Sequence, residues 1–132
     1  LYTAVDVEKV FARLVSVPYN RDHDAAKGVR FRFIEAGHVL GSAMVHVIAA
    51  APDRDRTLTF SGDMGRRGLP ILKPTGTIPP ADVLVCESTY GNRTHRSFTE
   101  TVEKLYAAVR DTAERGGKVL IPAFSLGRTQ LI

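Results

Sequence analysis

The sequence lacks the usual marks of secreted and membrane proteins. Cysteine occurs once, as Cys86, so no disulfide can form within the chain, and this favours a reducing, cytoplasmic setting. Because Cys86 ends an apolar run, we expect it to be a buried structural thiol. No apolar run approaches the ~20 residues that a membrane span requires, and we therefore expect no membrane partner.

The composition excludes a disordered protein and gives weaker evidence about the binding partners. Of the 132 residues, 44% are hydrophobic and 24% are charged, as in globular domains. The net charge of +4 and the pI near 9.5 favour an anionic partner. The chain opens on Leu1 rather than methionine and closes on Ile132, just after an expected helix start. We therefore expect a segment of a longer protein.

Three helices are predicted; the third starts near Arg128, and the first two each open on a capping box. Thr3 with Asp6 precedes apolar residues at helical spacing. Ser97 with Glu100 precedes a longer series of the same kind, which the pair Gly116-Gly117 ends.

Strands are predicted from two patterns. Alternating apolar residues indicate half-buried strands, and short uninterrupted apolar runs indicate strands that are covered on both faces. The first group comprises 29–35, 43–50 and 57–60, with a shorter candidate at 15–17; the second comprises 83–86 and 119–121. The polar or Gly- and Pro-rich stretches are predicted loops, at 19–28 and 65–80. A meander of strands followed by a strand–helix–strand unit predicts an α/β layered architecture, with no domain boundary before about Ile121.

Two groups of histidine and aspartate favour structural interpretations. His46 shares a strand face with Met44 and Ile48, so we interpret it as a packed or edge histidine rather than a ligand. Asp22-His23-Asp24 falls in a predicted loop, and its adjacent residues lack the separation that metal ligands normally have.

The candidate chemistry lies in three short motifs that follow apolar strands and contain glycine or small residues. They are Ala36-Gly37-His38-Val39-Leu40-Gly41-Ser42-Ala43, Ser61-Gly62-Asp63-Met64-Gly65 and Cys86-Glu87-Ser88-Thr89-Tyr90-Gly91. One imidazole and two carboxylates presented at a sheet edge suit part of a metal or acid–base site. Taken singly, His38, Asp63 and Glu87 also fit a turn histidine, an Asx-turn aspartate and a cap glutamate.

Together with Pro122-Ala123-Phe124-Ser125-Leu126-Gly127-Arg128-Thr129-Gln130, these motifs resemble the metallo-β-lactamase-fold nucleases of the β-CASP group. The most similar branch contains the pre-mRNA 3′-end cleavage nuclease and its bacterial and archaeal ribonuclease relatives. The resemblance runs from the first helix to the end of the chain. It implies part of a four-layer αβ/βα sandwich, a mixed sheet with flanking helices. Residues 1–121 would form the second part of the lactamase-like domain, and 122–132 the truncated entry to the β-CASP domain.

The resemblance also implies a role for individual residues. His38 matches a ligand of the first zinc, and Asp63 matches the aspartate whose carboxylate bridges two zincs. Glu87 matches the first acidic motif of the β-CASP set, which orients a distant histidine that protonates the leaving oxygen. Ser125 and Arg128 lie in the loop that enters the β-CASP domain and are candidate phosphate contacts.

Several family features are absent from these 132 residues. The His-x-His-x-Asp-His signature, the general-acid histidine and the last zinc ligand have no counterpart, and neither His23 nor His95 stands in their place. We therefore expect two zincs in the complete protein, but weak or no binding and no activity in this chain alone. Half a sandwich leaves apolar sheet surface uncovered, so a homodimer or companion chain segments are expected as partners.

The function that the resemblance implies is two-metal hydrolysis of RNA phosphodiester bonds, in RNA processing or decay, with RNA as the partner. Two alternatives stay open: a DNA-processing β-CASP nuclease, and a non-catalytic scaffold paralogue of the same fold. The presence of both His38 and Asp63 argues against the scaffold.

Overall fold

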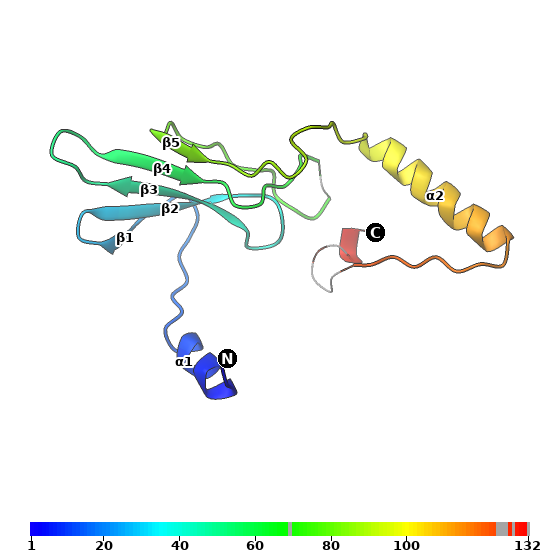
Figure 1. Cartoon of the computed structure of the whole chain (residues 1–132), viewed down its shortest axis with the longest axis horizontal. Coiled ribbons are helices and arrows are strands. Elements are labelled where there is room, and N and C mark those ends of the chain that lie inside the picture. Colours follow the sequence, from blue (N-terminus) through cyan, green and yellow to red (C-terminus); the bar gives the residue numbers. More distant parts are fainter. Residues whose placement is uncertain (69, 124–126, 128, 132) are drawn as a thin grey trace. The chain divides into compact units, whose positions relative to one another are not determined.

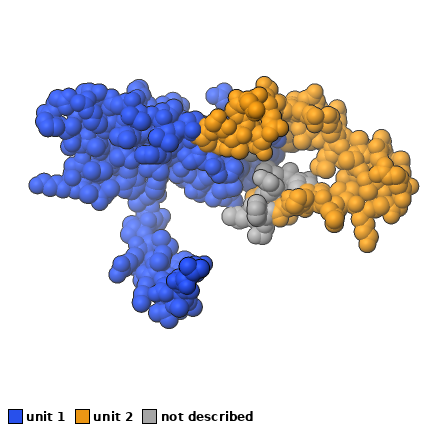
Figure 2. Space-filling view, in the orientation of Figure 1, with its two compact units in different colours: residues 1–86 blue, residues 87–132 orange. Residues whose placement is uncertain are grey.

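The computed structural model describes residues 1–68, 70–123, 127 and 129–131. The elements run in the order α1 (Ala4–Phe11), β1 (Asp22–Ala26), β2 (Val29–Glu35), β3 (Ala43–Ala49), β4 (Arg56–Phe60), β5 (Val83–Val85), α2 (Phe98–Glu114) and the 3-10 helix η1 (Thr129–Leu131), as Figure 1 shows. They fall into two compact units, Leu1–Cys86 and Glu87–Ile132, which are described separately (Figure 2). The predicted α/β class with a mixed sheet is confirmed.

The first unit is built on one five-stranded sheet in the order β1-β2-β3-β4-β5 (Figure 1). The first four strands form an antiparallel meander, and β5 pairs parallel with β4. Apolar residues lie opposite one another across β2 and β3, with Phe31 facing Val47 and Phe33 facing Val45. These cross-strand pairs fix the register, and the predictions for the three strands of the meander from Val29 onward are confirmed.

The polar stretch 19–28 was predicted as a loop, and this is wrong for Asp22–Ala26, which form β1. Ion pairs across the strands explain why such a polar segment pairs. The Asp22 carboxylate lies 2.7 Å from Arg32 and 3.3 Å from Arg30 on β2. An edge strand that presents charges also disfavours pairing with another chain. The shorter candidate at 15–17 is wrong too, because no described strand includes it.

A small buried cluster lies beside the β2–β3 connection. Ile34, Ala36 and Met44 are each at most 2% exposed, and Met64 and Ile78 pack against them. Because Met64 and Ile78 come from the long connection between β4 and β5, this cluster fixes that connection to the end of β2.

His46 is a packed histidine, as predicted. Its side chain is buried, and Nδ1 lies 2.9 Å from the Thr59 hydroxyl on β4. Burial lowers the pKa of His46, the positive charge of Arg32 lowers it further, and Asp22 acts in the opposite direction. The neutral imidazole is therefore the form that the fold favours.

This lowered pKa predicts how stability depends on pH. Below the ordinary histidine pKa of 6.5, the unfolded chain binds a proton that folded His46 does not. The free energy of unfolding is therefore expected to fall as the pH drops from about 7 towards 5. A His46→Gln variant lacks the titrating group and should show a shallower fall in urea denaturation. Above about pH 8 the difference between the two proteins should be constant, and equal slopes below pH 7 would contradict the prediction.

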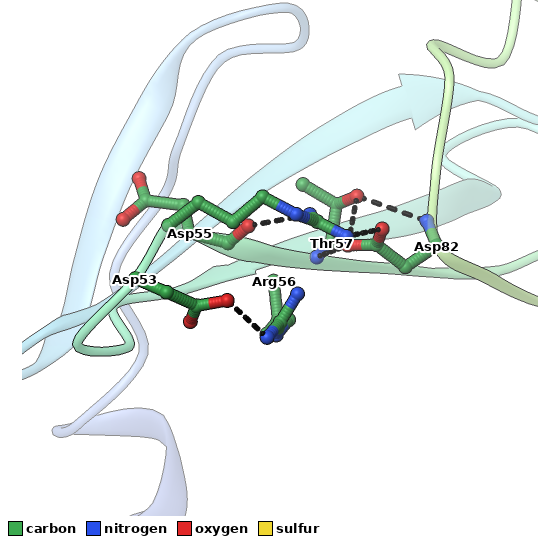
Figure 3. Close-up of polar contacts among 6 residues, drawn as sticks. Asp53, Asp55, Arg56, Thr57 and Asp82 are labelled. Atoms are coloured by element: carbon green, nitrogen blue, oxygen red, sulfur yellow. Dashed lines mark hydrogen bonds and ion pairs between the residues drawn. The ribbon is translucent and has the colours of Figure 1, made fainter.

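The start of β5 is fixed to β4 by Asp82 (Figure 3). Its carboxylate accepts hydrogen bonds from the Thr57 backbone N–H at 2.8 Å and from Arg54 Nη2 at 2.6 Å. The Asp82 N–H donates in turn to the Thr57 carbonyl at 3.0 Å. The Arg54 guanidinium, followed by the Thr57 N–H, holds the pKa of the Asp82 carboxyl well below its usual range. This contact starts the parallel pairing of β4 with β5.

Two predictions about the end of the first unit are wrong. The strand at Val83–Val85 exists, but its three side chains are 48%, 52% and 50% exposed rather than covered on both faces. Cys86 is exposed as well, not buried. The physical reason is position: β5 is an edge strand with β4 as its partner, so its apolar sequence indicates a face that no described element of this unit covers.

The second unit contains α2, whose predicted capping box is present. Ser97 accepts a hydrogen bond from the Glu100 N–H at 3.2 Å, and the Glu100 carboxylate accepts one from the Ser97 N–H at 3.0 Å. Gly116 follows the helix with φ +66°, a conformation that favours glycine and ends helices. The predicted strand at 119–121 is wrong, because those residues are exposed and no described strand pairs with them.

Within the described residues, no helix is both long enough and apolar enough to cross a lipid bilayer.

Candidate functional site

His38 lies in a loop of residues 36–42 that joins β2 to β3, and Ser42 organises this loop. The Ser42 hydroxyl accepts hydrogen bonds from the backbone N–H groups of His38, at 3.1 Å, and Val39, at 3.2 Å. The Tyr19 hydroxyl donates to the Ser42 carbonyl at 3.0 Å. These hydrogen bonds fix the backbone of the loop at His38. The position from which the His38 side chain extends is therefore defined.

Asp63 lies in a second loop, directly after β4, and this loop packs on the first. The Gly65 N–H donates to the Ala36 carbonyl at 2.9 Å. A Cβ at Gly65 would lie 1.7 Å from the Gly37 carbonyl oxygen, so a side chain cannot be accommodated there without moving the backbone. Glycine at 65 thus permits a backbone approach that brings the two loops together.

A third segment closes over both loops. The Thr75 hydroxyl lies 3.1 Å from the Ala36 carbonyl oxygen and 3.2 Å from the Gly65 carbonyl oxygen. The next residue, Gly76, donates its N–H to the Glu35 carbonyl at 2.8 Å. The connection between β4 and β5 therefore fixes the His38 loop and the Asp63 loop relative to each other.

These contacts place two predicted site residues side by side. His38 Nε2 lies 3.7 Å from Asp63 Oδ2, and the two side chains are 42% and 74% exposed. At this distance the two groups are in contact but too far apart for a hydrogen bond, and solvent has access to both side chains.

The geometry fits two ligands of one metal ion. Zinc bonds to histidine nitrogen and carboxylate oxygen are about 2.0–2.1 Å long, so tetrahedral coordination separates the two donor atoms by roughly 3.4 Å. The observed 3.7 Å is close to this separation. In the described part of the chain, no group of three or more His, Cys, Asp or Glu side chains is placed to hold a metal. His38 and Asp63 are thus a pair of candidate ligands rather than a complete site.

The remaining predicted site residues lie elsewhere. Glu87 belongs to the second unit, is partly buried, and accepts a hydrogen bond from the Thr89 hydroxyl at 2.6 Å. Ser125 and Arg128 lie outside the described residues.

Three residues that organise the site were not singled out from the sequence: Tyr19, Ser42 and Thr75. Ser42 had a usable signal, because it stands within the motif around His38. Tyr19 and Thr75 are far from either motif in the chain, and no local pattern indicates their contacts. Burial raises the pKa of the Tyr19 hydroxyl, and the charge of Glu35 adds to this effect, so the hydroxyl is favoured as a neutral hydrogen-bond donor.

Comparison with known proteins identifies the family. No protein-family model matches the chain. The chain is 39% identical over 134 aligned residues to Endoribonuclease YSH1 of Eremothecium gossypii, a match to 100% of this chain and 17% of that protein. It is also 39% identical over 128 residues to Ribonuclease TTHA0252 of Thermus thermophilus, covering 96% of this chain and 28% of that protein. The chain matches a segment of the β-CASP nucleases of the metallo-β-lactamase fold.

The β-CASP match extends to archaea. Transcription termination factor FttA of Pyrococcus horikoshii is 33% identical over 133 residues, covering 98% of this chain and 20% of that protein. The chain therefore spans between 17% and 28% of the length of these β-CASP relatives. Because the matches cover all or nearly all of the chain, they include the stretches around His38, Asp63 and Glu87. The resemblance to this family, drawn from the motifs, is confirmed.

Proposed function

We propose that the protein containing this chain is a zinc-dependent β-CASP ribonuclease that hydrolyses RNA phosphodiester bonds in RNA processing or decay. The chain would supply the second part of the lactamase-like domain (1–121) and the entry to the β-CASP domain (122–132), within a four-layer sandwich. The proposal rests on one observation: His38 Nε2 lies 3.7 Å from Asp63 Oδ2, in a chain 39% identical to a ribonuclease.

The two side chains suit different ligand roles. An imidazole offers one nitrogen to a metal, so His38 would hold a single zinc. The Asp63 carboxylate has two oxygens and would bridge two zincs. When bound, a zinc pair supplies an activated water and stabilises the charge that develops on the phosphate oxygens. The loops around Gly37, Gly65 and Thr75 would hold both donors in position before any ligand arrives.

Other residues of the chain have supporting roles in this proposal. Glu87 would orient a histidine from another part of the protein, which gives a proton to the leaving oxygen. Its hydrogen bond from Thr89 limits the orientations available to the carboxylate. The positive net charge would attract the phosphate backbone and make RNA binding depend on salt. Ser125 and Arg128 stay candidate phosphate contacts, and a cytoplasmic location stays a prediction.

RNA is the proposed substrate because of the relatives. Two of them are named for ribonuclease activity, in a fungus and in a bacterium. A DNA substrate or a scaffold role has no specific observation in its favour. An apolar strand β5 with about half of its surface exposed supports the expectation that further chain segments or a second copy cover the sheet.

Zinc content tests the proposal. Elemental analysis of the full-length natural polypeptide is expected to find about two zincs per chain, and His38→Ala or Asp63→Ala should lower that number. The matched controls are His23→Ala and Asp24→Ala, which change the same residue types on β1 and should leave the zinc content unchanged. A full-length protein without metal would overturn the zinc centre and favour the scaffold alternative.

A further inference from the structure

The loop between Glu87 and α2 contains a compact group of aromatic and basic side chains. We propose that Tyr90, Arg93 and His95 form a contact surface for single-stranded RNA. The planar groups of Tyr90 and Arg93 would contact unstacked bases, and the guanidinium would also meet phosphate oxygens. The choice of RNA rests on the proposed function, and the surface would make the loop after Glu87 part of the substrate path.

The three side chains contact one another. The Arg93 guanidinium carbon lies 4.9 Å from the centre of the Tyr90 ring, within the range of a cation–π contact. The Tyr90 and His95 rings are 5.1 Å apart and meet edge to face at 79°. Tyr90 is nevertheless 51% exposed. The ring is thus held in place by two neighbours while much of its surface stays available to a ligand.

The backbone explains why this group is ordered. The Gly91 N–H donates to the Ser88 carbonyl at 3.1 Å, and the Arg93 N–H donates to the Tyr90 carbonyl at 3.2 Å. These two successive turns bring Arg93 back over the Tyr90 ring. A surface that is ordered before binding loses less entropy when a ligand arrives.

The loop between Glu87 and α2 contains basic residues and no acidic ones. Residues 88–99 contain Arg93 and Arg96 but no Asp or Glu. The two flanking carboxylates are engaged locally, since Glu87 accepts from Thr89 and Glu100 accepts from Ser97. Among the described residues, neither arginine forms an ion pair. The loop therefore offers positive charge to an anionic strand.

Aromatic rings next to free guanidinium groups suit single strands in particular. Bases in a duplex are stacked on each other, whereas a single strand can present its base faces to protein rings and guanidinium planes. The position supports this assignment, because Tyr90 follows Glu87 by three residues. A strand held at Tyr90 would thus lie close to the carboxylate that, in the proposed function, orients the proton-donating histidine.

An exposed tyrosine alone would not support a binding site, and α2 provides the comparison. Tyr106 is 68% exposed, and within the described part of the chain it has no ring or cation contact. Arg110, on the same helix, is paired with Asp111 at 3.0 Å. These two residues match Tyr90 and Arg93 in type and belong to the same unit, so they serve as controls.

The test is binding of a fluorescein-labelled single-stranded RNA, measured by fluorescence anisotropy. The protein is the full-length natural polypeptide with Asp63→Asn, so that cleavage does not disturb the measurement. Tyr90→Ala and Arg93→Ala are expected to weaken binding on the order of tenfold each. Tyr90→Phe keeps the ring and should retain most of the affinity, and Arg93→Ala should lower the salt dependence by about one counterion. Tyr106→Ala and Arg110→Ala should bind as the parent does.

Two results would overturn the proposal: parental affinity in both Tyr90→Ala and Arg93→Ala, or an equal loss in the two α2 controls. Tyr90→Leu, which keeps the side-chain bulk, replaces Tyr90→Ala if circular dichroism shows that the alanine variant is unfolded. The assay is independent of metal and cleavage. If the full-length protein holds zinc and binds RNA normally without Tyr90 and Arg93, this surface alone is refuted. If the protein holds no metal but needs Tyr90 and Arg93 to bind RNA, the zinc centre alone is refuted.

Discussion

Replacing Asp63 with asparagine in the full-length protein is expected to reduce the rate of RNA cleavage by on the order of 10³-fold. Asparagine has nearly the same shape as aspartate but only one oxygen and no charge, so it cannot bridge two metals. Stabilisation of transition-state charge by a metal centre is worth several kcal/mol, and each ~1.4 kcal/mol corresponds to a factor of ten in rate. The measurement is single-turnover cleavage of a labelled single-stranded RNA.

The fold should survive this change. The Asp63 side chain is 74% exposed, so the free energy of unfolding should change by less than ~0.5 kcal/mol. Asp53→Asn is the matched control, because Asp53 is an exposed carboxylate that pairs with Arg56 at 2.7 Å on the turn before β4. This control should cleave RNA at the parental rate. Cleavage that is unaffected by Asp63→Asn would remove Asp63 from the proposed metal centre.

Replacing Gly65 with alanine is expected to have the largest effect on stability. The added Cβ would meet the Gly37 carbonyl oxygen at 1.7 Å, the Gly37 carbonyl carbon at 2.1 Å and the His38 nitrogen at 2.8 Å. All three are backbone atoms, which cannot turn aside as a flexible side chain does. Because overpacking commonly costs 1–3 kcal/mol even where side chains can adjust, we expect a loss of about 3 kcal/mol or more in urea denaturation. Separation of the two loops should also lower the zinc content.

Gly68→Ala separates the two possible causes of this loss. Gly68 has φ +81° and nothing near its missing Cβ, so alanine there meets backbone strain without a collision. We expect a cost of about 1–2 kcal/mol and an unchanged zinc content. If Gly65→Ala were no worse than Gly68→Ala, the close packing of the two loops would not be important for stability.

The sequence predicts elements well where local signals agree. Neighbouring residues determine both ends of α2. The structure shows the capping box of Ser97 and Glu100 at its start and the glycine after its last turn. The alternation from Val29 to Glu35 likewise identifies β2, although the structure does not divide the strand into one packed and one solvated face: Arg30 is exposed, and Ile34, on the same face, is buried. Such patterns depend on residues close in the chain.

Predictions failed where a distant partner decides the outcome. Asp22 to Ala26 has a loop-like composition, but Arg30 and Arg32 on β2 pair with Asp22 and permit a strand. Residues 119–121 have a strand-like composition, but within the described structure no strand pairs with them. In the first case ionic partners outside the segment override its local preference, and in the second the lack of a pairing strand among the described residues does.

In the candidate site too, local motifs indicate the chemical groups, whereas distant contacts decide their geometry. The motifs indicate His38 and Asp63 as chemical groups, because glycine-flanked polar residues after strands are suited to present side chains. Their separation of 3.7 Å depends on Thr75 and on the contact between Gly65 and Ala36. No spacing in the sequence indicates those contacts, which only the three-dimensional structure reveals.

The strand connections also bear on the order in which the first unit folds. β1 to β4 are joined by the short connections 27–28, 36–42 and 50–55, whereas β5 joins β4 only after 61–82. Hairpins with short connections form within microseconds, and pairing across long connections is slower because more chain entropy is lost first. We therefore expect the meander to form early and β5 to pair late. The segment with Thr75 lies in the late-closing connection, so a newly synthesised chain should possess its sheet before His38 and Asp63 are fixed side by side.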